Sequence, residues 1–228
     1  MGTLYVIGTP IGNLNDISNR AIEILSAVSA VACEDTRTTG FLLNHLGLKK
    51  QLLSFHSHNE HGRVQQLIDM LSQGQDIALV SDAGMPGISD PGFLIIRQAH
   101  LNKIPVSVIP GPSAALTALV ASGLPCDRFC FEGFLPQKKG RKSKLEALKI
   151  EERTMVFFES PFRIIRLVEE CIHHFGEDRL GCFGRELTKK FEEIQRGTIA
   201  ELLISLKERP SIKGEFVLVI AGSTYKET

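Results

Sequence analysis

Hydrophobic residues follow two patterns that alternate along the first half of this chain. Short runs rich in Val, Ile, Leu and Ala, typical of buried strands, are each followed by a segment in which apolar residues recur at helical spacing. The expected strands are TLYVIG (3–8), AVAC (30–33), QLLSF (51–55), DIALV (76–80) and IPVSVIPG (104–111). The expected helices are 16–28, with Asp16 as its N-cap, 38–47, 59–74, 92–102 and 113–123. Strands that alternate with helices predict a parallel sheet covered by helices on both faces.

The pattern changes near SGLPCDR (122–128), beyond which the apolar runs contain more polar positions. The strands expected there are 128–136, 154–160, 180–187, 191–197 and 214–222, and the helices are 161–176 and 198–208. This order predicts an α+β domain with a mixed sheet. The fold class is therefore α/β with two domains, residues 1–120 and 121–228.

The composition is that of a globular protein, with 228 residues, 43% of them apolar, and 26 basic against 26 acidic side chains. This balance predicts no strong overall attraction to nucleic acid or to an anionic membrane, although a local basic patch can still bind RNA. The first residues lack the basic region of a signal peptide, and no apolar run approaches the ~20 residues that span a bilayer. The five cysteines contain no CxxC pair, and no Cys/His spacing matches a zinc site. We therefore expect a cytoplasmic protein with reduced thiols, no membrane segment and no metal.

Three loops rich in Gly and Pro follow expected strands of the first domain: GTPIGN (8–13), SDAGMPGISDPG (81–92) and PGPSAA (110–115). Ligands of parallel sheets bind beyond the carboxyl ends of the strands, where these loops lie. The loops contain no Lys or Arg, and the chain has neither the GxGxxG nor the GxxxxGK[ST] motif. We expect a ligand that is neither a dinucleotide nor a nucleoside triphosphate held in the usual way.

Two polar clusters also follow expected strands. CEDTR (33–37) offers Glu34, Asp35 and Arg37 for catalysis, although Asp35 or Thr36 could instead cap a helix. HSHNE (56–60) is a second candidate catalytic cluster, in which His56 could orient or deprotonate a hydroxyl group. Its other candidates, Asn59 and Glu60, could hold the acceptor, or Glu60 could be a charge of the first helical turn.

Basic and aromatic residues of the second domain are candidates for binding a polyanion. The segment QKKGRKSK (137–144) carries Lys138, Lys139, Arg141, Lys142 and Lys144, and RELTKK (185–190) carries Arg185 and Lys189. Such clusters bind phosphates in a salt-dependent manner, or they are solvated surface loops without a partner. In FFESPFR (157–163), Phe158 or Phe162 could stack on a base, whereas Phe157 is expected in the core.

Eight blocks in order resemble the ribosomal RNA small-subunit methyltransferase I family, a branch of the tetrapyrrole-methylase-like fold. They are LYVIGTPIGNLNDIS, CEDTR, SFHSHNE, SDAGMPGISDPG, PGPSAALTAL, FEGFLP, FFESPFRI and RELTK, and the resemblance covers nearly the whole chain, from Leu4 to Gly222. The resemblance implies transfer of a methyl group from S-adenosylmethionine to the ribose 2′-hydroxyl of a cytidine in small-subunit ribosomal RNA. It also implies a homodimer, with the cofactor bound between the two domains and ribosomal RNA or the assembled small subunit as partner.

The resemblance further implies which residues contact the cofactor. They are Pro10, Ser81, Asp82, Met85, Ser113, Ala114, Glu159 and Leu187. A loop with aspartates and without basic residues suits the sulfonium and ammonium groups of S-adenosylmethionine.

Two other functions are compatible with the same sequence. A methylase of small tetrapyrroles would share the fold, but the basic segment 137–144 favours a polyanionic substrate. A non-catalytic nucleotide-binding module would share the loops, but it would not need the polar clusters at 33–37 and 56–60.

Overall fold

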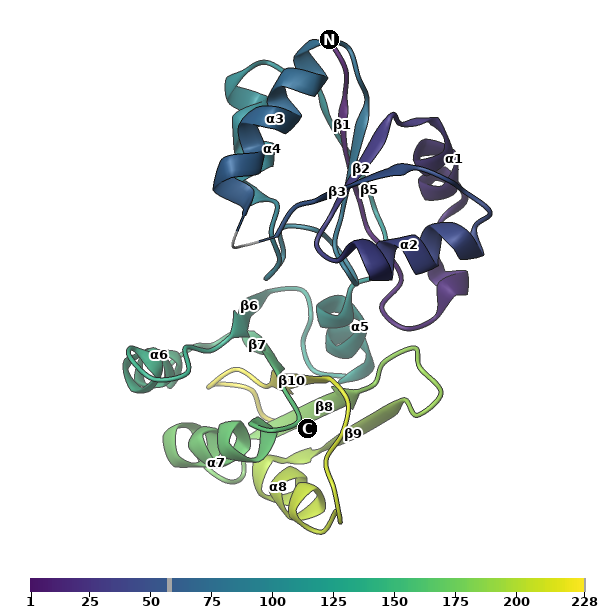
Figure 1. The fold of residues 1–228 in the computed structure, drawn as a ribbon. Helices are drawn as coiled ribbons and strands as arrows, with labels where there is room; N and C mark the ends of the chain where they lie inside the picture. The colour runs from purple at the N-terminus through teal and green to yellow at the C-terminus, as the bar shows by residue number, and fades with distance from the viewer. Residues whose placement is uncertain (57–58, 228) are drawn as a thin grey trace. The chain divides into compact units, whose positions relative to one another are not determined.

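The computed structural model describes residues 1–56 and 59–227, which form two compact units that divide between Ser113 and Ala114 (Figure 1). The sequence placed this division at residue 120, at the end of helix α5 (Ala114–Ala121). Helix α5 belongs to the second unit because it packs against strands of that unit's sheet.

The first unit has a five-stranded, fully parallel sheet in the order β3-β2-β4-β1-β5. Its strands are β1 (Leu4–Ile7), β2 (Ala30–Cys33), β3 (Gln51–Ser54), β4 (Ile77–Val80) and β5 (Val106–Ile109). Its α-helices are α1 (Asn19–Ala27), α2 (Thr36–His45), α3 (Glu60–Ser72) and α4 (Phe93–Leu101). The crossover helices lie on both faces, as expected for strands that are buried on both sides.

Side chains of successive strand residues point to opposite faces of this sheet. Leu4 and Val6 of β1 join the core formed with α3 and α4, whereas Ile7 joins the core formed with α1 and α2. Figure 1 shows the same arrangement, with α1 and α2 on one side of the sheet and α3 and α4 on the other. Because all five strands are parallel, their carboxyl ends, which carry the glycine loops, meet at one edge of the sheet.

The second unit has a mixed five-stranded sheet in the order β6-β7-β10-β8-β9. Its strands are β6 (Phe129–Phe134), β7 (Thr154–Glu159), β8 (Leu180–Arg185), β9 (Glu193–Thr198) and β10 (Phe216–Ile220). Of the pairs of this second sheet found in the described residues, only β6–β7 is parallel. Helices α6 (Arg141–Leu148), α7 (Ile164–Phe175) and α8 (Ile199–Lys207) share one core with this sheet, and α5 also packs against β7, β8 and β10.

Two details differ from the sequence expectation. Helix α1 is capped by Ser18, whose hydroxyl accepts a hydrogen bond from the amide of Ala21 at 3.2 Å, and not by Asp16. Asp16 instead ends a short 3-10 turn (Leu14–Asp16) that is capped by Asn13. Helix α6 was not predicted, because its sequence is rich in Lys and Arg and its preceding residue, Gly140, provides no side-chain cap. The other predicted strands and helices are present, and the predicted fold class is confirmed.

The cysteines are free thiols, and four of the five are buried. Among the helices of residues 1–56 and 59–227, none is long and apolar enough to cross a membrane. Within the same residues, no group of three or more His, Cys, Asp or Glu side chains is arranged to hold a metal ion.

Candidate active site

The glycine loops of the first unit lock together through their main chains. Thr9, just beyond β1, forms an isolated antiparallel bridge with Gly84 in the loop after β4. The amide of Thr9 donates to the carbonyl of Gly84 at 2.9 Å, and the amide of Gly84 donates back at 3.1 Å. The hydroxyl of Thr9 also donates to the carbonyl of Ser81 at 3.1 Å. These bonds fix the first two loops as one surface.

Gly8 and Gly111 bring the first and third loops into contact. A Cβ atom on Gly8 would lie 2.6 Å from the sulfur of Met85 and 2.8 Å from the Cα of Gly111. A Cβ atom on Gly111 would lie 2.7 Å from the carbonyl oxygen of Gly8. Real Cβ atoms do not approach so closely, so any other residue at either position would push the loops apart.

The residues expected to hold a cofactor are distributed over these loops. Pro10, Ser81 and Asp82 line a cavity of about 70 Å³ together with Thr38 and Thr39 of α2. Ser81 is buried, and its hydroxyl donates to the carbonyls of Ala83 and Gly84, both at 3.2 Å. Ser81 therefore stabilises the loop, and its contact with a cofactor stays a prediction.

Two other expected cofactor contacts, Ser113 and Ala114, lie at the junction of the units. Ser113 ends the first unit, and Ala114 is the first residue of α5. Only Pro112 separates Ser113 from Gly111, so both residues lie close in sequence to the contact between the first and third loops.

The cluster after β2 contains one capping residue and one perturbed acid. Asp35 is the N-cap of α2, because its carboxylate accepts a hydrogen bond from the amide of Arg37 at 2.8 Å. It also pairs with the exposed guanidinium of Arg37 at 2.6 Å, which lowers the pKa of Asp35 to about 2. Glu34 is different: burial and then the charge of Asp82 raise its pKa. Of the three candidates, Glu34 is therefore the more suitable proton acceptor.

Asp82 links the loop after β4 to the cluster after β2, since its Oδ1 atom accepts a hydrogen bond from the amide of Asp35 at 3.0 Å. The far end of the same loop contributes Asp90, which the sequence reasoning did not select. Burial, and next the charge of Glu34, raises the pKa of Asp90 to about 6. The sequence feature that could have identified Asp90 is its place as the second aspartate of SDAGMPGISDPG, a loop with enough turn residues to bring its two ends together.

The cluster after β3 is organised by Asn59. Its side-chain oxygen accepts a hydrogen bond from the amide of His56 at 2.8 Å, and its Nδ2 atom donates to the carbonyl of Ser54 at 3.2 Å. Asn59 therefore shapes the turn, and Glu60 is the first residue of α3. Burial raises the pKa of Glu34 and the charge of His56 opposes this rise, so the two clusters interact. Two residues of the predicted motif, Ser57 and His58, lie outside the described residues.

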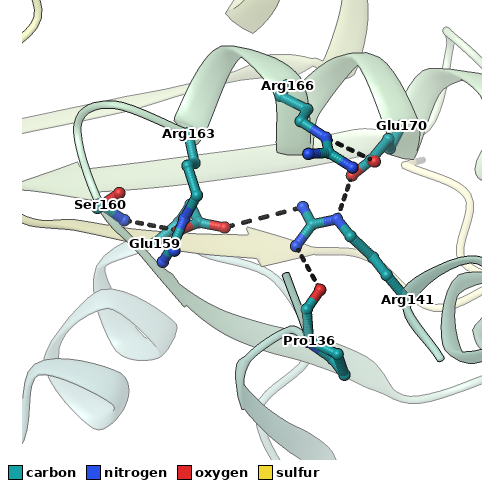
Figure 2. A network of polar contacts seen from close by, with 7 residues as sticks. All are labelled: Pro136, Arg141, Glu159, Ser160, Arg163, Arg166 and Glu170. Atoms are coloured by element: carbon teal, nitrogen blue, oxygen red, sulfur yellow. Dashed lines mark hydrogen bonds and ion pairs between the residues drawn. The ribbon is translucent and has the colours of Figure 1, made fainter. Parts of the chain in front are cut away.

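Figure 2 shows a buried network in the second unit that changes two expectations. The Arg141 side chain is 4% exposed, and its Nε atom lies 2.7 Å from Glu170. Its Nη1 atom donates to the carbonyl of Pro136 at 3.3 Å. The prediction that Arg141 contacts RNA phosphates is wrong in this structure, because its guanidinium faces the protein interior.

The carboxylate of Glu159 is enclosed in the same network. Its Oε1 atom accepts hydrogen bonds from Arg163 at 2.7 Å and from the amide of Ser160 at 2.9 Å. Its Oε2 atom lies 3.8 Å from the Nη2 atom of Arg141, and neither of these two atoms has a hydrogen-bond partner. With the side chain fully buried, this carboxylate is unavailable to a cofactor, so the expected contact is not supported for its side chain.

The lysines next to Arg141 are placed differently. Lys138, Lys139 and Lys142 are exposed. Lys144 is 45% exposed and pairs with Glu132 at 2.7 Å. The basic segment therefore presents lysines to solvent, with Arg141 as its buried anchor.

The turn after β8 contains the remaining candidates. Arg185 pairs with Glu193 at 3.1 Å, and Lys189 pairs with Glu186 at 2.9 Å and with Glu215 at 3.0 Å. Each cation is thus partly neutralised by a carboxylate. Leu187 is 5% exposed and packs against Gly184, so its side chain belongs to the core of the turn.

Backbone strain is concentrated in these loops. Four described non-glycine residues have a positive φ, and three of them are Ser89 (φ 64°), Glu186 (φ 49°) and Thr188 (φ 64°). Such residues are strained and cluster at functional sites. The strain supports the choice of the loops after β4 and β8 as candidate sites.

The fold and the loops are those of the tetrapyrrole methylase family of proteins. A family model for Tetrapyrrole (Corrin/Porphyrin) Methylases matches residues 3–203. The solved structure of uroporphyrin-III-C-methyltransferase from Thermus thermophilus is similar with a TM-score of 0.68 at 20% identity, over 98% of this chain and 95% of that one. Diphthine synthase is similar with a TM-score of 0.74 at 14% identity, over 97% and 90% of the two chains. These two likenesses concern the fold alone.

Relatives with higher identity define the family more narrowly. The chain is 48% identical to "Ribosomal RNA small subunit methyltransferase I" of Escherichia coli O157:H7, over 99% of this chain and 80% of the relative. It is 49% identical to the protein of the same name from Haemophilus influenzae, over 97% of this chain and 79% of the relative. The chain belongs to the ribosomal RNA small subunit methyltransferase I family.

Proposed function

We propose that this protein methylates the ribose 2′-hydroxyl of a cytidine in small-subunit ribosomal RNA. Membership of the family makes it a methyltransferase that uses S-adenosylmethionine. The observation that carries the choice of substrate is the 48% identity over nearly the whole chain to a relative named for small-subunit ribosomal RNA. The tetrapyrrole enzyme with a similar fold is 20% identical, so it supports the fold and not the substrate.

The glycine loops of the first unit fit S-adenosylmethionine. Residues 8–13, 81–92 and 110–115 contain no Lys or Arg, and the cofactor carries a sulfonium and an ammonium group but no phosphate. The exposed carboxylate of Asp82 would attract these cations. Gly8 and Gly111 let the first and third loops pack closely, which would hold the loop surface in the shape that the cofactor contacts. When bound, the cofactor supplies a methyl group that its sulfonium already activates.

The chain's own contribution to the reaction is to position the acceptor hydroxyl and to accept its proton. A base works best with a pKa near the working pH, and such a group contributes roughly 100- to 10,000-fold to the rate. Asp90, with a pKa of about 6, has this property, and Glu34 beside it has a raised pKa as well. We assign proton acceptance to Asp90 and orientation of the ribose to Glu34 and His56.

The exposed lysines of the second unit would hold the RNA backbone. Lys138, Lys139 and Lys142 are exposed and adjacent in sequence, so they could neutralise neighbouring phosphates. Cytoplasmic ribosomal RNA, bare or in the small subunit, would be the partner.

We also propose that the protein is a homodimer. Helix α5 has the sequence AALTALVA and is apolar around its circumference. One face packs on the sheet of its own unit, while Leu116 is 50% exposed and Val120 is 72% exposed. Apolar helices of this kind are usually buried, and a second copy would bury this face. In sedimentation velocity, Val120→Glu should shift a wild-type dimer to monomer; an unchanged dimer would exclude α5 from the interface.

Transfer from radiolabelled S-adenosylmethionine tests the proposed substrate. The acceptors are bare small-subunit RNA, assembled small subunits lacking the modification, and a tetrapyrrole. We expect label in RNA or in subunits and none in the tetrapyrrole. Label in the tetrapyrrole alone would replace the proposal by small-molecule methylation, and cofactor binding without any transfer would favour a binding module.

A further inference from the structure

Two exposed phenylalanines lie at the carboxyl ends of neighbouring parallel strands in the second unit. Phe134 ends β6 and is 52% exposed, and Phe162 lies in the loop after β7 and is 93% exposed. Strands β6 and β7 pair so that Phe134 lies opposite Phe158, four residues before Phe162. Both rings therefore belong to the same edge of the sheet.

The exposed ring of Phe134 is supported from behind. Its centroid lies 5.6 Å from that of Phe158, with the rings at 62°. Phe158 in turn lies 5.0 Å from Phe131, at 74°. Edge-to-face contacts of this kind stabilise aromatic pairs, and Phe134 remains 52% exposed beside them.

The loops that carry Phe134 and Phe162 are also fixed to one another. Arg141 donates to the carbonyl of Pro136, two residues after Phe134, and faces the buried carboxylate of Glu159. The other oxygen of Glu159 accepts from Ser160 and Arg163, on either side of Phe162 (Figure 2). Arg141 and Glu159 therefore link the two loops through the protein interior.

The charge beside these rings identifies what would cover them. Lys138 and Lys139 follow Phe134 by a few residues in the same loop, and Lys142 lies in the first turn of α6, the helix that this loop enters. Surfaces that bind single-stranded nucleic acid combine aromatic rings, on which bases stack, with cations that follow the backbone. An apolar protein partner would have no use for three exposed lysines at the same place.

We propose that Phe134 and Phe162 are stacking residues for a single-stranded segment of the RNA substrate, with its phosphates held by Lys138, Lys139 and Lys142. The proposal rests on the proposed function and adds residues that recognise the RNA. Because every nucleobase has an aromatic face, this platform would select for unpaired RNA and not for a base sequence.

Salt dependence separates the two parts of the platform. The probe is a fluorescein-labelled single-stranded RNA oligonucleotide, titrated at several salt concentrations. Phe134→Leu with Phe162→Leu should weaken binding roughly fivefold to a hundredfold per stacked base at every salt concentration. Replacing the three lysines by Ser should instead lower the log–log salt slope by roughly 0.7 for each phosphate that is no longer neutralised.

One control variant and one further test variant accompany these. Phe191→Leu removes another exposed ring of the second unit, 68% exposed, and should bind RNA like the wild type. Phe162→Ala alone removes a ring that is 93% exposed, so it should lower RNA affinity without any effect on folding.

Methyl transfer to small-subunit RNA distinguishes failure of this proposal from failure of the proposed function. The expected result is an active wild type and a raised KM for RNA in the phenylalanine variants. An active wild type with unchanged RNA affinity and KM in Phe162→Ala and in the double variant overturns the platform alone. The platform is also overturned if sedimentation shows that the double variant has changed its oligomeric state and this change accounts for the lost RNA affinity. The surface would then join two copies of the protein. A wild type that methylates no RNA overturns the proposed function itself.

Discussion

Replacing Asp90 by Asn should make the protein more stable and less active. Burial and the charge of Glu34 raise the pKa of Asp90 from 3.8 to about 6, so the folded protein binds this proton more tightly than the unfolded chain does. A shift of roughly two pKa units corresponds to about 3 kcal/mol at neutral pH. Because Asp90 is only partly buried, solvent screening reduces this to roughly 1–2 kcal/mol. Asn keeps the shape of the side chain and removes the charge that burial disfavours.

The sign of the effect depends on pH. A folded-state pKa above the unfolded value means that the wild type loses stability as the pH rises from about 4 to about 6, and that this loss is complete above that range. The variant should therefore unfold a few degrees higher than the wild type at pH 8, and at the same temperature near pH 4. Thermal unfolding across this pH range measures the difference, and Asp69→Asn on the exposed face of α3 is the control.

The activity of the same variant tests the assignment of the base. Single-turnover methyl transfer should fall roughly 100-fold or more, and the acid limb of the wild-type pH–rate profile, near pH 6, should disappear. If Asp90→Asn is less stable than the wild type at pH 8, the electrostatic reasoning is refuted. An acid limb that persists in the variant would assign the base to another residue, with Glu34 the next candidate.

Three further predictions concern the loops and the buried network. Gly8→Ala should abolish most S-adenosylmethionine binding in calorimetry, because its Cβ atom would lie 2.6 Å from the Met85 sulfur, whereas Gly62→Ala, which meets nothing within 4 Å, should bind normally. Asp82→Ala should weaken cofactor binding roughly tenfold or more, as expected when one charge-assisted hydrogen bond is removed, with circular dichroism unchanged; equal affinity would remove Asp82 from the site. Arg141→Met should destabilise the second unit by roughly 3–5 kcal/mol in urea, because Glu159 would remain buried without its cation. Lys142→Met, on the exposed side of the same helix, should change stability by less than about 0.5 kcal/mol, and equal losses in the two variants would contradict the role of the buried pair.

The fold could be predicted from the sequence because the strands of the first unit are short, apolar and separated by helices with clear periodicity. Helix α6 was missed because only Leu145 and Leu148 mark its buried side, and charged residues fill the rest. That omission also explains the error at Arg141. In a loop it would have been exposed, whereas on this helix it points inward to Glu170 and Pro136.

The candidate site was predicted in part. The position of the glycine loops follows from the order of strands, since carboxyl ends of parallel strands meet at one edge. Which polar residue performs which task depends on contacts between distant segments, which no local pattern contains. Asp35 became a helix cap and Asn59 a turn residue, while Asp90 acquired its raised pKa from burial and from Glu34, a residue on another loop.

The alkali resistance of the product tests the central claim most directly. A methyl group on a ribose 2′-oxygen prevents that oxygen from attacking the adjacent phosphodiester, so the linkage survives alkali. Small-subunit RNA treated with this protein and S-adenosylmethionine should therefore gain one alkali-resistant dinucleotide, with cytidine on its 5′ side and with the label in it. If the RNA is labelled but every linkage is still cleaved by alkali, the methyl group is on a base, and the assignment of a ribose acceptor is wrong.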